Sequence, residues 1–253
     1  MVDRFVIPFV LALRFLTIIP VPLSVEITSR RASRAMAWFP VVGLIIGGIL
    51  VLVDRALAFV FPPLVNAGLL LVVWVGVTGA LHFDGFVDCC DGLFAAKSPE
   101  QRLEILRDIH LGSYAVVGAV SLLLIKFALL VVLPGEYRIT ALLVTPALAR
   151  AAIVYAARAF PYARRSSGLG QFFRETLTWY EVIVAVSIAV GAAGVALTWR
   201  GLVLALSVWA LTVGIAAWGK RRIGGLTGDV YGAIAELTEV GALLCTVLIA
   251  RVL

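Results

Sequence analysis

Long apolar segments separated by short polar ones constrain the fold of this chain more than any other feature of its sequence. A run of about 20 apolar residues crosses a bilayer as an α-helix. Hydrophobic residues make up 62% of the 253 positions and charged residues only 14%, whereas a soluble domain carries about 25% charged residues. Too little polar sequence remains to cover a soluble core. We therefore expect an all-α, polytopic integral membrane protein in which residues 1–253 form one bundle of helices.

Seven segments have the length and composition of transmembrane helices. Pro62, Pro134 and Pro161 end three of them, because proline cannot continue the hydrogen-bond ladder of a helix. The segment 1–23 is also apolar, but three prolines interrupt it, and we expect it to lie in the membrane interface or to re-enter the protein. No A-x-A-like site follows it, so no cleavable signal peptide is expected. The predicted spans are residues 36–61, 68–81, 114–133, 139–160, 180–199, 201–219 and 230–253.

The basic residues predict the orientation of these spans. If the spans alternate, four long loops lie on one side of the membrane and hold twelve Lys or Arg residues, whereas the opposite loops hold only Arg138 and Arg200. Loops rich in Lys and Arg face the cytoplasm in most membrane proteins. The loops that we expect to be cytoplasmic are residues 29–35, 84–111, 161–179 and 219–229.

An acidic motif in residues 82–92 carries the strongest chemical signal. On a helix, Asp84, Asp88 and Asp91 fall on one face. Three carboxylates on one stripe repel one another, and a hard divalent cation such as Mg²⁺ relieves this repulsion. A solvated acidic face is the simpler interpretation, but apolar side chains such as Phe86 flank the stripe, and carboxylates close to the membrane usually have a function.

Two further residues near this motif are candidates for the chemistry. His82 precedes Asp84 by two residues and is either a general base or a hydrogen-bond partner of that carboxylate. Asp108 precedes a turn at Gly112 and is a further candidate metal ligand. The rest of segment 99–112 has the spacing of an amphipathic interfacial helix, which explains its other charges equally well.

A second acidic element begins at a glycine-rich turn. Gly225 and Gly228 leave backbone N–H groups free to face an anion at the start of a helix, where phosphate groups bind well. Asp229 and Glu236 are seven residues apart, so they share one face of that helix. Asp229 is the stronger candidate metal ligand, and Glu236 could instead interact with the ligands without binding the metal itself.

Basic residues precede the glycine-rich turn and also occur in a second loop, residues 162–172. Lys220 and Arg221 could hold phosphates or contact anionic lipid headgroups. Arg164 and Arg165 lie in a basic loop that suits an anionic substrate, although arginines next to membrane spans are common. The three cysteines form no C-x-x-C pair, so a zinc or redox site has little support.

The motif H-x-D-G-x-x-D-x-x-D-G at residues 82–92 resembles the signature of the cobalamin (5′-phosphate) synthase family, also called adenosylcobinamide-GDP ribazoletransferases. Segments 14–20, 39–43 and 225–236 resemble that family too, so the likeness runs nearly from end to end. One departure is His110, which stands where the family pattern leads us to expect arginine.

The resemblance implies a bacterial inner-membrane enzyme that uses Mg²⁺ and joins α-ribazole, or its 5′-phosphate, to adenosylcobinamide-GDP with release of GMP. The metal ligands would come from the five aspartates and the glutamate named above, and His82, Asp84 and Asp88 would be catalytic. The basic and glycine-rich loops would hold the diphosphate. The lipid bilayer is an expected partner and nucleic acid is not, and the oligomeric state, including a homo-oligomer, stays open.

Two alternatives remain at this point. The carboxylate spacing also resembles half of the CDP-alcohol phosphotransferase pattern, but the upstream D-G-x-x-A-R half is missing. An ion-coupled transporter with intramembrane carboxylates is the second alternative. It is less well supported, because the acids cluster at one side of the membrane and no inverted repeat is apparent.

Overall fold

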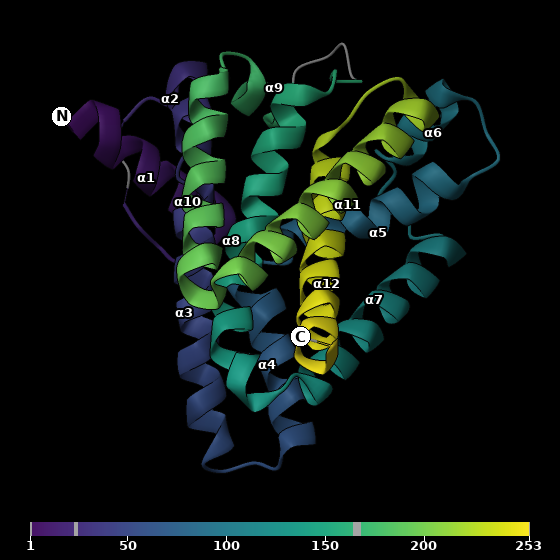
Figure 1. Cartoon of the computed structure of the whole chain (residues 1–253). Helices are drawn as coiled ribbons and strands as arrows, with labels where there is room; N and C mark the ends of the chain where they lie inside the picture. The colour runs from purple at the N-terminus through teal and green to yellow at the C-terminus, as the bar shows by residue number, and fades with distance from the viewer. Residues whose placement is uncertain (1, 23–24, 164–167, 253) are drawn as a thin grey trace.

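The computed structural model describes residues 2–22, 25–163 and 168–252, and every regular element within them is a helix (Figure 1). The elements follow the apolar segments of the sequence, and short polar or proline-containing turns separate them. The helices are α1 (Val2–Leu16), α2 (Ser29–Met36), α3 (Phe39–Ala58), α4 (Pro63–Val77), α5 (Leu81–Phe94), α6 (Pro99–Ile105), α7 (Ser113–Val132), α8 (Gly135–Ala159), α9 (Leu169–Arg174), α10 (Trp179–Leu197), α11 (Trp199–Ile223) and α12 (Gly228–Val252).

The predicted polytopic helical fold is confirmed. Six of the described helices are long and apolar enough to cross a membrane, namely α3, α7, α8, α10, α11 and α12, and α4 with α5 forms a bent pair that makes a seventh span if counted as one. The N-terminal helix α1 has 15 residues with Pro8 inside it. This is shorter than a span requires and fits an interfacial or re-entrant segment.

The bent pair sets the position of the acidic motif. Helix α4 has 15 residues, a length of about 22 Å that falls short of a bilayer core. Gly79 and Ala80 follow it with φ angles of 59° and 54°, a left-handed backbone that ends the helix. The chain then turns by 91° into α5. As a result α5 runs across the upright helices instead of continuing through the bundle (Figure 1).

Helix α8 forms the centre of the bundle, with most of its residues buried. Gly43 and Gly47 on α3 face it, and β-carbons added there would lie 2.5 Å from the Ala147 Cα and the Leu143 carbonyl oxygen respectively. Small residues four apart let two membrane helices approach this closely. The close pair α3–α8 provides a rigid support for the elements at its ends.

The polar elements gather at one end of the bundle. Helices α2, α6 and α9 lie at this end with the loop 224–227, and the connections α3–α4 and α7–α8 lie at the other (Figure 1). The assignment of the first end to the cytoplasm remains a prediction from the distribution of basic residues.

Candidate functional site

A cleft of about 250 Å³ opens between α5, α9 and the start of α12. The two acidic elements meet here, because Asp84 on α5 and Asp229 on α12 both line it. His82, Gly85 and Gly228 line it beside them. The other lining residues are Phe15, Met36, Phe39, Leu81, Ile153, Tyr162, Gly168, Leu169, Gly170, Phe173 and Tyr231.

Two glycines allow α5 and α12 to approach each other. A β-carbon on Gly85 would lie 2.9 Å from the Asp229 Cα and from the Asp229 carbonyl oxygen, and one on Gly232 would lie 2.7 Å from the carbonyl oxygen of His82. Real β-carbons are not found this close to backbone atoms, so any side chain at either position would push the helices apart. Gly85, in the first D-G pair of the acidic motif, is therefore required by its contact with α12.

The first turn of α12 presents Asp229 to the cleft. The Thr227 hydroxyl donates a hydrogen bond of 3.1 Å to Asp229 Oδ2, and the Tyr231 amide donates one of 3.1 Å to the Thr227 carbonyl oxygen. Gly228, the first residue of the helix, lines the cleft as well. The N-terminal end of a helix attracts anions through its exposed N–H groups and its dipole.

Gly225 has a different position from the one predicted for a phosphate-binding glycine. It is buried against the backbone of residues 161–163, and a β-carbon there would lie 2.7 Å from the Ala163 amide nitrogen. Hydrogen bonds of 2.8 Å from Ala163 N to Leu226 O and from Leu226 N to Pro161 O tie the two segments together. Gly225 thus lets the loop before α12 pair with the loop after α8, which holds Tyr162 at the cleft.

Aromatic rings form one wall of the cleft. Phe15 lies 5.9 Å from Phe39 and 4.4 Å from Phe173, measured between ring centroids. Phe15 and Phe39 belong to two of the sequence segments that resemble the family, and Phe173 lies on α9. Segments that are far apart in the chain therefore meet at one aromatic surface beside the carboxylates. Sequence reasoning did not single out Phe173, Tyr162 or Tyr231.

His82 is buried beside the cleft, with 5% of its surface exposed. Among the residues that the structure describes, none forms a hydrogen bond with its Nδ1 atom. Its backbone carbonyl faces Gly232 at the α5–α12 contact. His82 is therefore fixed at this helix contact, with a buried ring among the residues that line the cleft.

Asp91 points to another helix. Its two carboxylate oxygens accept hydrogen bonds from Gly112 N at 2.6 Å and from Ala115 N at 2.9 Å. These amides belong to the first turn of α7, so the Asp91 carboxylate caps that helix from 21 residues away in the sequence.

The other predicted ligands on this side are dispersed. Asp88 is half-buried on α5, one turn beyond Asp84. Asp108 is exposed, and its pKa is held below the ordinary value because the His110 ring and the His110 amide hydrogen-bond to the carboxylate at 2.7 Å and 3.0 Å. Within the described part of the chain, no three His, Cys, Asp or Glu side chains are grouped closely enough to hold a metal ion by themselves.

Glu236 belongs to a buried group of four charges. Lys126 on α7 donates a hydrogen bond of 2.8 Å to Glu236 and another to Glu239, and Arg150 on α8 pairs with the second carboxylate of this group, Glu239. The Lys126 ammonium also lies 4.6 Å from the ring of Trp74 on α4. These four side chains, two basic and two acidic, are buried between α7, α8 and α12 and join the three helices.

Sequence reasoning missed Lys126 and Arg150, although a signal was present. Both are charged residues inside predicted spans, where an ionisable group is costly unless it is paired. The structure describes only two of the four basic residues that were predicted to hold phosphates. Lys220 and Arg221 are exposed in the last turn of α11, and Arg164 and Arg165 lie outside the described residues.

Comparison with known proteins identifies what the chain is similar to. The sequence profile described as cobalamin-5-phosphate synthase matches residues 8–247. An adenosylcobinamide-GDP ribazoletransferase of Thermoanaerobacter pseudethanolicus is 35% identical over 244 residues, which cover 94% of this chain and 96% of that protein. Proteins of the same name from Roseiflexus sp. and Deinococcus radiodurans are 37% and 40% identical, over 92% and 91% of this chain and 86% and 83% of their own lengths. No solved structure matches the chain.

Proposed function

The chain belongs to the cobalamin-5-phosphate synthase family, and from this premise we propose that it is a membrane transferase that joins α-ribazole, or its 5′-phosphate, to adenosylcobinamide-GDP and releases GMP. The observation that carries this proposal at the level of residues is that Asp84 and Asp229 line one cleft at the N-terminus of α12. The relatives favour this reaction over the chemistry of a CDP-alcohol phosphotransferase or an ion-coupled transporter.

The reaction replaces a phosphoanhydride bond with a phosphate ester bond. A ribose hydroxyl oxygen forms a bond to the phosphorus attached to the corrinoid side chain, and the bond from that phosphorus to the GMP oxygen breaks. The hydroxyl loses its proton, and GMP leaves with the electron pair. Such a transfer depends mainly on positioning the reactants and neutralising charge. The anion-attracting start of α12, with Gly228 at its first position, suits a diphosphate.

Magnesium fits the residues that line the cleft. Mg²⁺ is commonly bound through one or two carboxylates together with substrate phosphates and water, and Asp84 with Asp229 supplies two carboxylates beside an open space. When bound, the ion would neutralise charge on the diphosphate and polarise the bond to GMP. A metal site that the substrate completes needs few protein ligands. This agrees with the described part of the chain, in which no group of three candidate ligands occurs.

The remaining acidic residues take graded roles in this proposal. Asp88 and Asp108 stay predicted ligands that substrate binding would have to recruit. Asp91 and Glu236 act indirectly, because Asp91 fixes the start of α7 and Glu236 anchors α12 to Lys126. His82 is the proposed acceptor of the hydroxyl proton, because it lines the cleft together with Asp84.

The loops that carry the cleft are proposed to face the cytoplasm of a bacterial cell, where nucleotides are available. The twelve-to-two distribution of basic residues supports this orientation. The basic residues Lys220 and Arg221 lie at the same end of the bundle as the glycine-rich loop and would attract the anionic substrate.

Turnover by the purified protein tests the reaction. The protein in detergent is incubated with adenosylcobinamide-GDP, Mg²⁺ and either α-ribazole or its 5′-phosphate. We expect a complete corrinoid nucleotide and one GMP for each product molecule. No product with either nucleoside form, together with turnover of a CDP-activated alcohol, would refute the proposal.

A further inference from the structure

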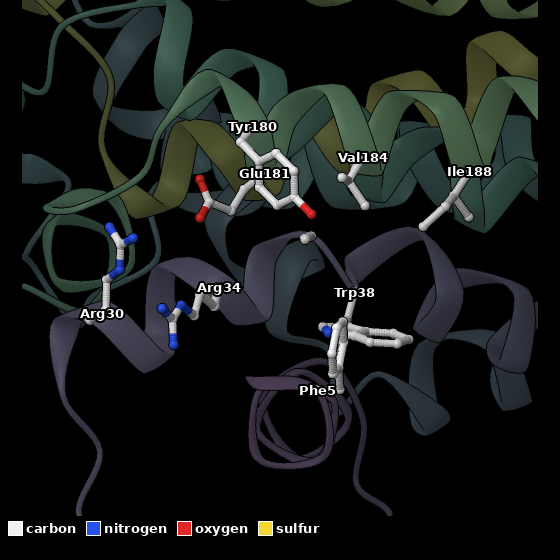
Figure 2. Close-up of a pocket in the computed structure, with 9 residues that line it drawn as sticks. Phe5, Arg30, Arg34, Trp38, Tyr180, Glu181, Val184 and Ile188 are labelled. Carbon is white, nitrogen blue, oxygen red and sulfur yellow. The ribbon is translucent and has the colours of Figure 1, made fainter. Parts of the chain in front are cut away.

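A second hollow, separate from the reaction cleft, lies on the side of the bundle between α2 and α10 (Figure 2). Its volume is about 360 Å³. Its polarity changes along its length. Arg30 and Arg34 stand at one end, and Val184 and Ile188 line the other end on α10 (Figure 2). We call this hollow the lateral groove.

Arg30 and Arg34 give the polar end of the groove a positive charge. Arg30 is exposed and Arg34 is half-buried, and neither guanidinium group has a hydrogen-bond or ion-pair partner among the described residues. The one carboxylate in the lining, Glu181, accepts hydrogen bonds from the amide and hydroxyl of Thr178, which caps α10. The polar end of the groove is therefore complementary to an anion.

The apolar end follows a membrane-spanning helix. Val184 and Ile188 are one turn apart on α10, and Ile188 lies about 10 Å along the helix from Glu181. The rings of Phe5 and Trp38 form the facing wall (Figure 2). Since α10 is long and apolar enough to cross the membrane, the groove runs from the polar end of the bundle toward the bilayer interior.

We propose that the lateral groove binds one anionic glycerophospholipid of the adjacent leaflet. Its phosphate would contact Arg30 and Arg34, and one acyl chain would lie along Trp38, Val184 and Ile188. A soluble anion would use only the polar end and leave the apolar end empty. A lipid matches both ends. In the leaflet where α10 begins, its headgroup would lie toward the arginines and its acyl chains toward the bilayer interior.

The bound lipid would also stabilise the reaction cleft, an inference that rests on the proposed function. Helix α2 carries both arginines, and its Ser33 hydroxyl donates a hydrogen bond of 2.7 Å to the carbonyl oxygen of Phe173. Thr176 donates to the same hydroxyl at 2.9 Å. Phe173 is part of the aromatic wall of the cleft. A lipid that holds α2 therefore holds this wall, and activity should rise with lipid occupancy.

Lipid retention tests the site without reference to activity. Delipidated protein is titrated with dioleoyl phosphatidylglycerol or dioleoyl phosphatidylcholine, and bound lipid is counted by native mass spectrometry. We expect one tightly held phosphatidylglycerol, and roughly 30-fold weaker retention in the double variant Arg30→Gln/Arg34→Gln, because each arginine near an anionic headgroup contributes substantially to binding. The control Arg55→Gln/Arg251→Gln removes the same charge at two other exposed positions and should bind like the wild type.

Two further arms separate a lipid from a soluble anion. Val184→Trp fills the apolar end and leaves both arginines in place, and it should also weaken retention. Inorganic phosphate should not displace the lipid. Wild-type retention in the arginine variant or in Val184→Trp, or displacement by millimolar phosphate, would overturn the proposal.

The link to the cleft has its own measurement. GMP release in phosphatidylglycerol nanodiscs should exceed that in phosphatidylcholine nanodiscs for the wild type and not for Arg30→Gln/Arg34→Gln. Equal rates in the two lipids with intact lipid retention would reject the link alone. Absence of GMP release under all conditions would reject the proposed function and leave the lipid site standing.

Discussion

Gly85 on α5 lies directly against the backbone of Asp229 on α12, with no room for a β-carbon between them. This contact joins the two acidic elements of the sequence, which are separated by more than 130 residues. Asp84, next to Gly85, consequently lines the same cleft as Asp229. The geometry of the proposed reaction depends on how closely these two helices pack.

We predict that Gly85→Ala lowers kcat/KM by about 10²-fold, because a displacement of about 1 Å between catalytic elements has an effect of that size. GMP release measures the rate, and thermal unfolding in detergent checks the fold. Gly48→Ala is the matched control, since a β-carbon at Gly48 meets no atom within 4 Å. Full activity in Gly85→Ala would show that the close contact is unnecessary.

We predict that Asp84→Asn and Asp229→Asn each lower turnover by roughly 10²–10³-fold, the usual effect of removing one group that stabilises charge in the transition state. The Mg²⁺ concentration for half-maximal rate should rise in both. Asp91→Asn should instead lower the unfolding temperature with a smaller effect on Mg²⁺ dependence, because Asp91 caps α7. Wild-type rates for Asp84→Asn at saturating Mg²⁺ would refute the assignment.

We predict that His82→Ala lowers the rate and leaves the affinity for Mg²⁺ nearly unchanged, because the proposed role of His82 is to accept a proton. Rates measured as a function of Mg²⁺ concentration separate the two effects. If the affinity for Mg²⁺ falls together with the rate, His82 orients Asp84 and another group takes the proton.

We predict that Lys126→Met destabilises the protein by about 3–5 kcal/mol, because it leaves a buried carboxylate without its partner. The double variant Lys126→Met/Glu236→Gln removes one charge of each sign and should be more stable than the single variant. Unfolding in detergent measures all members of this double-mutant cycle. Additive losses in the double variant would contradict a charge-balanced group of four.

We predict that the polar end of the bundle faces the cytoplasm. Cysteines placed at the exposed positions Ser98 and Lys220 should react with a membrane-impermeant reagent only after the cells are opened, whereas one at Glu136 should react in intact cells. The native cysteines give little background, since Cys89 and Cys90 are buried and Cys245 is partly buried. Labelling of Ser98→Cys from outside would reverse the proposed orientation.

The sequence predicted the helical spans well because apolar length is a local property. It also predicted that residues 82–92 form a helix with acids on one face. It did not predict the bend at Gly79 and Ala80, because a 91° turn depends on what α5 packs against. Hydropathy alone reads the segment before the motif as an ordinary short span.

The other differences between the predicted and the observed contacts of the acidic residues arise from partners that are distant in the chain. The helical spacing of the acidic motif gives no sign that Asp91 meets amides at the start of α7. Glu236 shares a helix face with Asp229, as the spacing predicted, but Lys126 is 110 residues away and contacts it from another helix. Helical periodicity predicts which face a residue occupies and carries no information about which side chain lies opposite.

The small volume of the cleft has a consequence for selectivity. A space of about 250 Å³ is below the usual size of a pocket that encloses a drug-sized molecule, and a corrin macrocycle is larger still. For the proposed substrate, a cleft of this size would admit the phosphate-bearing arm and leave the tetrapyrrole outside. Such an enzyme would accept corrinoids with altered upper axial ligands, and compact diphosphate analogues without any macrocycle would compete as inhibitors.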